Sequence, residues 1–178
     1  MRVFRIFIFF CTILLGGMSA RAQQPPPLSA MPKGGFQFTG NWTCAGAFGN
    51  GRVHKSTYTG AVILGGKWLE LTEQDVEPSS GYLAKYLIGF DAQQTKLVEF
   101  DANNFSAATY SSDTGWKGNV LTMTSAVTQD ARAPYAANQF VYTINGPDSF
   151  TVDWQISRSV ALNWTTSDHL VCRRDAKS

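Results

Sequence analysis

The sequence predicts an all-β domain, an antiparallel up-and-down β-barrel of about ten strands, and three observations lead to this prediction. Short segments rich in β-branched and aromatic residues recur between Gly, Pro and Asn turn signals. No segment of any length has a convincing amphipathic helical period. Cys44 and Cys172 lie near opposite ends of the domain, and a bridge between them would make the first and last strands neighbours. An open two-sheet sandwich is the competing architecture.

The first 22 residues have the pattern of a secretory signal peptide, which predicts an exported protein, periplasmic or secreted. Arg2 and Arg5 precede an apolar run that is shorter than the roughly 20 residues of a membrane span. Small residues follow and end in the cleavage signal Ala20-Arg21-Ala22. Residues 23–35 are rich in Pro and Gly and are interpreted as a flexible tether. A single barrel domain is expected over residues 36–175.

The predicted strands alternate between two faces with period two and are separated by short turns. Asn50-Gly51 and Asn145-Gly146 are the clearest tight-turn signals. Residues 126–138 lack alternation and are expected to form a loop or a lid. The ten predicted strands cover residues 36–47, 52–64, 67–77, 82–91, 96–102, 107–111, 116–125, 139–145, 150–157 and 162–173.

The charge balance excludes one large class of partner. The chain has 15 Lys and Arg and 13 Asp and Glu, and three of the basic residues belong to the leader. Cleavage would therefore leave 12 bases against 13 acids, a net charge of −1 with neutral histidines. No basic cluster remains beyond Arg173-Arg174, so nucleic acid is not an expected partner. No integral membrane span is expected after cleavage, and no particular protein partner is indicated.

Two cysteines lie outside the leader, Cys44 and Cys172, in a chain addressed to an oxidising compartment. A disulfide is the natural interpretation, and two buried thiols are the alternative. Trp42 shares a strand face with Cys44 because successive side chains of a strand alternate. We therefore expect both side chains to point into the barrel.

A tryptophan in the first strand combined with an arginine in the last resembles the lipocalin-like (calycin) β-barrels, and more closely the secreted bacterial lipocalin-like domains of unknown function. The resemblance implies that Trp42 closes the barrel base and that an arginine packs over it. Parity with Cys172 favours Arg174 over Arg173 for this role. The predicted strand number departs from the eight of true lipocalins. The other matching motifs are Leu64-Gly65-Gly66-Lys67-Trp68-Leu69, Gly89-Phe90-Asp91 and Gly115-Trp116-Lys117-Gly118-Asn119-Val120-Leu121-Thr122.

Aromatic side chains recur on the predicted strands and suggest a pocket. In a barrel of this size, inward side chains either fill the interior or line one small cavity. The first case predicts a non-catalytic envelope or interaction protein with a filled barrel, and the second predicts a carrier or sensor of a small, mostly apolar ligand. The predicted ligand-binding residues are Tyr58, Tyr86, Tyr110, Tyr142 and Trp154.

No catalytic, metal or cofactor motif is present, so we expect no enzyme and no cofactor. Glu73 and Asp75 share a strand face, as do Glu99 and Asp101, and their polar neighbours predict a solvated outer face rather than an acid–base site. His54 lies far from His169 in the sequence, which gives no metal-ligand spacing. His169 is three residues from Cys172 and should face outward, which argues against a haem ligand in the barrel.

Overall fold

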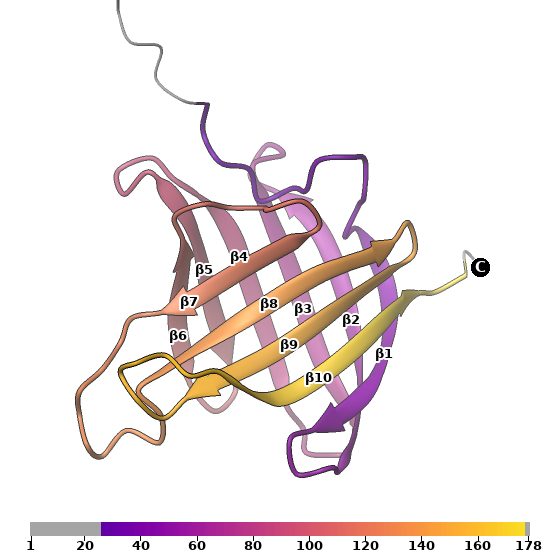
Figure 1. Ribbon diagram of the computed structural model, residues 1–178. Helices are drawn as coiled ribbons and strands as arrows, with labels where there is room; N and C mark the ends of the chain where they lie inside the picture. The colour runs from indigo at the N-terminus through magenta and orange to yellow at the C-terminus, as the bar shows by residue number, and fades with distance from the viewer. Residues whose placement is uncertain (1–25, 177–178) are drawn as a thin grey trace, which may run out of the picture.

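The computed structural model describes residues 26–176 and shows a closed antiparallel barrel of ten strands (Figure 1). Each strand pairs with its neighbours in sequence, and β1 pairs with β10 to complete the closure. This confirms the predicted fold class; the predicted signal peptide lies outside the described residues. The strands are β1 (Gly40–Phe48), β2 (Val53–Ile63), β3 (Trp68–Glu77), β4 (Leu83–Asp91), β5 (Lys96–Asn103), β6 (Ala107–Ser112), β7 (Val120–Ser125), β8 (Ala137–Gly146), β9 (Ser149–Ser157) and β10 (Thr165–Arg174).

The seam between β1 and β10 is closed by the predicted disulfide. Cys44 faces Cys172 in the strand register, and their sulfur atoms are bonded across a sequence separation of 128 residues. Both cysteines are fully buried, as strand parity predicted. In the chain-entropy model, a bridge closing a loop of this length stabilises the fold by up to about 4–5 kcal/mol.

Several predicted strand boundaries shift in the structure: the first strand begins at Gly40 rather than at residue 36, and the last begins at Thr165 rather than at residue 162. The segment predicted as a strand from residue 116 begins as β7 only at Val120, because the chain turns over residues 113–119. Residues 126–136 form the expected loop, since β8 begins at Ala137. The described residues contain no helix that is long and apolar enough to cross a membrane.

One end of the barrel is filled by aromatic side chains around Trp42. The Trp42 ring lies 4.8 Å from that of Phe150 and 5.8 Å from that of Phe36. Phe38 packs 5.1 Å from Phe150, and its carbonyl accepts a 2.8 Å hydrogen bond from Trp42 Nε1. Gly60 lets the Phe38 carbonyl approach, because a Cβ at this position would collide with it. Trp42 therefore closes the base, as the resemblance implied.

The chain before β1 covers this closed end (Figure 1). Ala30 is buried, and its carbonyl accepts a 3.0 Å hydrogen bond from Trp116 Nε1. Leu28 and Met31 pack against the core, and Pro32 is also buried. This part of the segment interpreted as a flexible tether is thus packed against the barrel, because the apolar residues between its prolines find a partner in the aromatic end.

Arg174 lies over Trp42, with its guanidinium carbon 4.1 Å from the ring centroid. Its nitrogens donate to Asp148 at 2.8 Å, to the Thr39 carbonyl at 2.6 Å and to the Gln37 carbonyl at 2.7 Å. Arg174 therefore ties the segment before β1 to the final strand. Arg173 is exposed, so parity with Cys172 selected the correct arginine.

Replacing Arg174 with alanine is expected to lower the free energy of unfolding by about 1–2 kcal/mol while the fold is retained. The loss comes from the cation–π contact and from charge-assisted hydrogen bonds to backbone carbonyls. Arg173→Ala is the matched control and should change stability by less than about 0.5 kcal/mol. Urea unfolding of both variants measures the difference, and equal midpoints would contradict the role given to Arg174.

Candidate functional site

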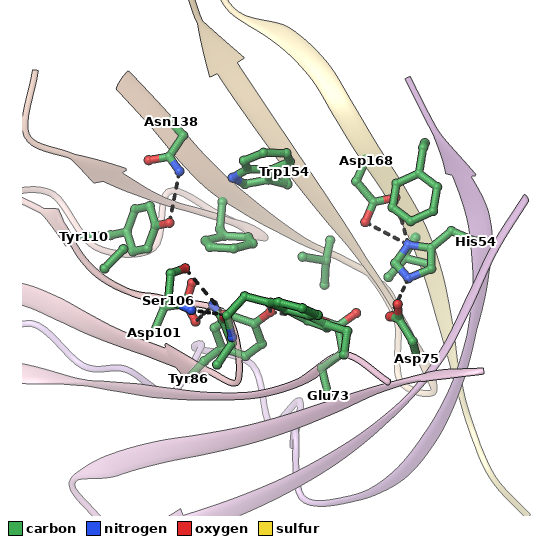
Figure 2. A pocket seen from close by; sticks show the side chains of 18 of the residues that line it. His54, Glu73, Asp75, Tyr86, Asp101, Ser106, Tyr110, Asn138, Trp154 and Asp168 are labelled. Carbon is green, nitrogen blue, oxygen red and sulfur yellow. Dashed lines mark hydrogen bonds and ion pairs between the residues drawn. The ribbon is translucent and has the colours of Figure 1, made fainter. Parts of the chain in front are cut away.

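The opposite half of the barrel is hollow. A cavity of about 530 Å³ lies between the strands, at the end away from Trp42. Phe48 and Asp168, which line it, are paired with each other at the far end of the β1–β10 seam. Phe105, in the turn between β5 and β6, lines the cavity and is strongly exposed. An interior space thus lies beyond the closed aromatic base, and Figure 2 shows side chains that line this space.

Four of the five predicted ligand-binding residues line this cavity. Tyr58, Tyr86 and Tyr110 enter it from β2, β4 and β6, and Trp154 enters it from β9. Tyr142 does not line it; this residue is fully buried and donates a 3.1 Å hydrogen bond to Glu99. The tyrosines thus point into the barrel as predicted, but Tyr142 is packed in the interior and does not line the cavity.

His54 is the centre of a charged group at one side of the cavity. Its Nδ1 lies 2.8 Å from an Asp168 oxygen, and its Nε2 lies 3.0 Å from an Asp75 oxygen. The imidazole also stacks on Phe48 at 4.3 Å. Burial lowers the pKa of His54, but the hydrogen bonds with Asp168 and Asp75 and the charges of Asp168 and Glu73 outweigh it and raise the pKa to about 9. His54 is therefore an imidazolium held between two carboxylates at neutral pH.

Glu73 lies inside the barrel, and this corrects the predicted solvated outer face. It is buried and accepts a 2.7 Å hydrogen bond from the Tyr86 hydroxyl, which also lies 3.2 Å from the Tyr82 hydroxyl. Burial raises the pKa of Glu73, and hydrogen bonds from Tyr86 and Tyr58 together with the charge of His54 partly oppose the shift. The prediction assumed that water solvates Glu73, whereas in the structure tyrosine hydroxyls donate to it.

Glu99 and Asp101 are also buried inside, so the outer-face expectation is wrong for β5 as well. Burial raises the pKa of Glu99 to about 8, because desolvation outweighs the hydrogen bond from Tyr142. Burial also raises the pKa of Asp101, which accepts a 3.1 Å hydrogen bond from Asn103. Phe100, the residue between them, is exposed and points outward, so this strand has its acidic side chains inside and an apolar side chain outside.

Residues 126–138, the segment predicted as a loop or a lid, contribute two polar residues to the cavity wall, Tyr135 and Asn138. Asn138 donates to the Tyr110 hydroxyl at 3.1 Å and to the Tyr135 hydroxyl at 3.3 Å. The Tyr135 ring packs edge-on against Trp154 at 5.9 Å. The loop before β8 thus contributes Tyr135 to the cavity wall, and hydrogen bonds attach it to the barrel.

His54, Glu73 and Asp75 offer ligand atoms that lie within 4.8 Å of one another, a spacing that could hold a metal ion. However, both imidazole nitrogens already have carboxylate partners, so a metal would have to displace Asp75 from Nε2. His169 lies on the outer face, as parity predicted, with its Nδ1 2.6 Å from Asp153. The arrangement inside the cavity favours holding a ligand by charge, hydroxyl groups and aromatic faces.

No protein-family model matches this chain, and comparison with curated proteins gives no match at the significance required. These comparisons show no family for the chain, and the architecture alone can be compared with the lipocalin-like fold. A closed antiparallel barrel with one end plugged by Trp42 and Arg174 is compatible with that fold.

Proposed function

We propose that this chain is an exported, lipocalin-like β-barrel that binds a small molecule in its interior and acts as a carrier or sensor, without catalysis. The observation that supports this most directly is the cavity of about 530 Å³ above the aromatic floor. Pockets of about 300–1,000 Å³ accommodate small ligands. The disulfide is consistent with export to an oxidising compartment, periplasmic or extracellular.

The walls indicate an aromatic or apolar ligand body with a polar group attached. Rings of Tyr58, Tyr86, Phe140 and Trp154 supply the apolar surface. Tyrosine hydroxyls, Asn138 and buried carboxylates supply polar contacts at fixed positions. This refines the expectation of a mostly apolar ligand, because so many polar groups in one cavity favour a ligand that engages some of them. The alternative function, an interaction protein with a filled barrel, does not account for this cavity.

Blocking the cavity should abolish binding while the fold is preserved. Ala108 lines the cavity on β6, and Ala102 lies exposed on the neighbouring strand β5. We expect Ala108→Trp to weaken binding of the neutral dye N-phenyl-1-naphthylamine at least tenfold, whereas Ala102→Trp leaves it unchanged. Dye fluorescence titrations measure both. Equal affinity for the two variants, or no dye binding by the unmodified protein, would contradict the proposal.

Native mass spectrometry of the protein purified from its own compartment gives an independent test of the same proposal. A retained small molecule that is lost from Ala108→Trp but kept by Ala102→Trp supports the carrier or sensor function. A clean mass for the unmodified protein, combined with a stable protein partner, supports the rival interaction function.

A further inference from the structure

The cavity wall carries acidic groups that the protein itself does not neutralise. Among the described lining residues there are four acids, Glu73, Asp75, Asp101 and Asp168, and neither Lys nor Arg. The one basic group, His54, is already held by Asp75 and Asp168. The cavity wall therefore carries more acidic than basic side chains, in a region where water is partly excluded.

Two of these acids form no ion pair with a described residue, Glu73 and Asp101; Glu73 has His54 within 4.8 Å, whereas no described cationic group pairs with Asp101. Asp101 is buried, with 6% of its surface exposed, and within the described part of the chain only the Asn103 amide donates to its side chain. Some surface carboxylates do have a cationic partner, since Asp130 pairs with Arg132 and Asp148 pairs with Arg174. Figure 2 shows Asp101 and the His54 group on different sides of the cavity.

The space beside Asp101 is open and lined with aromatic rings. In the strand register Asp101 lies between Tyr86 on β4 and Ala108 on β6, and all three line the cavity. Ala108 is small, so it leaves room next to the carboxylate. Phe140 stands over this region, with its ring 5.4 Å from Tyr86 and 5.1 Å from Tyr110.

A buried carboxylate beside aromatic faces favours one class of ligand. The carboxylate is costly to bury alone, and an opposite charge at hydrogen-bond distance offsets that cost. The faces of aromatic rings carry a negative electrostatic potential, so they also attract cations. An anionic ligand would meet repulsion from both.

We propose that the ligand is an organic cation, an amine with an aromatic or apolar body, whose ammonium group is held by Asp101. This inference rests on the proposed ligand-binding function and names the ligand class of the same cavity. The ammonium donates to the Asp101 carboxylate beside Ala108, and the body lies against Phe140, Tyr86 and Tyr110. The proton stays on the amine, and no covalent step is involved.

A matched pair of probes tests this proposal. 2-Phenylethylamine and 2-phenylethanol have the same ring and chain length and differ in carrying an ammonium or a hydroxyl group. In displacement of N-phenyl-1-naphthylamine at pH 7.5, the amine should be effective at about a ten- to hundredfold lower concentration than the alcohol. Asp101→Asn should remove this difference and leave the alcohol unaffected. Asp113→Asn, at an exposed position, is the control and should preserve the difference.

The outcomes separate the two proposals. If the unmodified protein binds the dye but the amine displaces it no better than the alcohol, the cationic ligand class is wrong and the binding function stands. If no dye binds, the binding function itself fails. If Asp101→Asn keeps the full preference for the amine, Asp101 is not the counter-ion. Should that variant fail to fold, the comparison of the two probes on the unmodified protein still decides the ligand class.

Discussion

Replacing Trp42 with alanine is expected to lower the free energy of unfolding by about 3–5 kcal/mol, the range for removing a large buried aromatic side chain. The indole is fully buried among Phe36, Phe38 and Phe150. Its loss would open a void at the barrel base, free the Phe38 carbonyl from its hydrogen bond and leave Arg174 without the ring beneath it. Urea unfolding followed by far-ultraviolet circular dichroism measures the loss.

Two further variants give this prediction its controls. Trp42→Phe keeps much of the packing and loses the hydrogen bond, so we expect an intermediate loss that remains measurable if the alanine variant does not fold. Trp68 stacks on Phe100 on the outer face of the barrel, and Trp68→Ala should cost clearly less. Equal losses for Trp42→Ala and Trp68→Ala would show that Trp42 does not plug the base.

Strand parity made the closed end of this barrel predictable. Trp42 and Cys44 share a face of one strand, Cys172 and Arg174 share a face of another, and a single bridge fixes the register between the two. Each inference needed only the period of a strand and one long-range constraint. The packing of residues 28–32 could not be predicted in this way. These residues lie outside any strand, so no alternation indicates which of their side chains are buried.

The buried acids were misplaced because residue polarity was given more weight than strand register. Tyr86 was predicted to face inward, and the short turn after Asp91 pairs Tyr86 with Asp101 and Ile88 with Glu99. Directly paired residues of antiparallel strands point to the same face. The register of this hairpin was therefore a signal that could have placed both acids inside.

His54 and Asp168 could have been recognised in the same way. His54 shares a face with Tyr58, four residues later on β2, and Asp168 shares a face with Cys172, four residues later on β10. The contact between His54 and Asp168 could not have been recognised in this way. It joins residues 114 positions apart, and it depends on β10 pairing beside β1 and on side-chain rotamers that no sequence pattern specifies.

The protein is expected to lose stability as the pH rises from about 4.5 to 8, and Glu99 contributes a part of this loss that one substitution can isolate. Burial raises the pKa of Glu99 from its ordinary value of 4.5 to about 8. In this window the folded state keeps the proton while the unfolded state has released it, so rising pH favours unfolding. At about 1.4 kcal/mol for each pKa unit, the full loss is about 4–5 kcal/mol. His54 adds a smaller loss in the same direction between pH 6.5 and about 9, because its pKa is also raised.

Glu99→Gln should remove the part of this pH dependence that Glu99 contributes. The amide is neutral at every pH and can still accept the hydrogen bond from Tyr142, while the second carboxyl oxygen, Oε2, has no partner among the described residues to lose. We therefore expect the stability of the variant to rise relative to the unmodified protein by about 3–5 kcal/mol between pH 4.5 and 8.5. Glu70→Gln, on the outer face beside Lys85, is the matched control and should leave the profile unchanged. Urea midpoints across this pH range give the comparison. Parallel profiles for Glu99→Gln and the unmodified protein would mean that Glu99 is ionised inside the barrel at neutral pH, with a cation or ordered water beside it that compensates its burial.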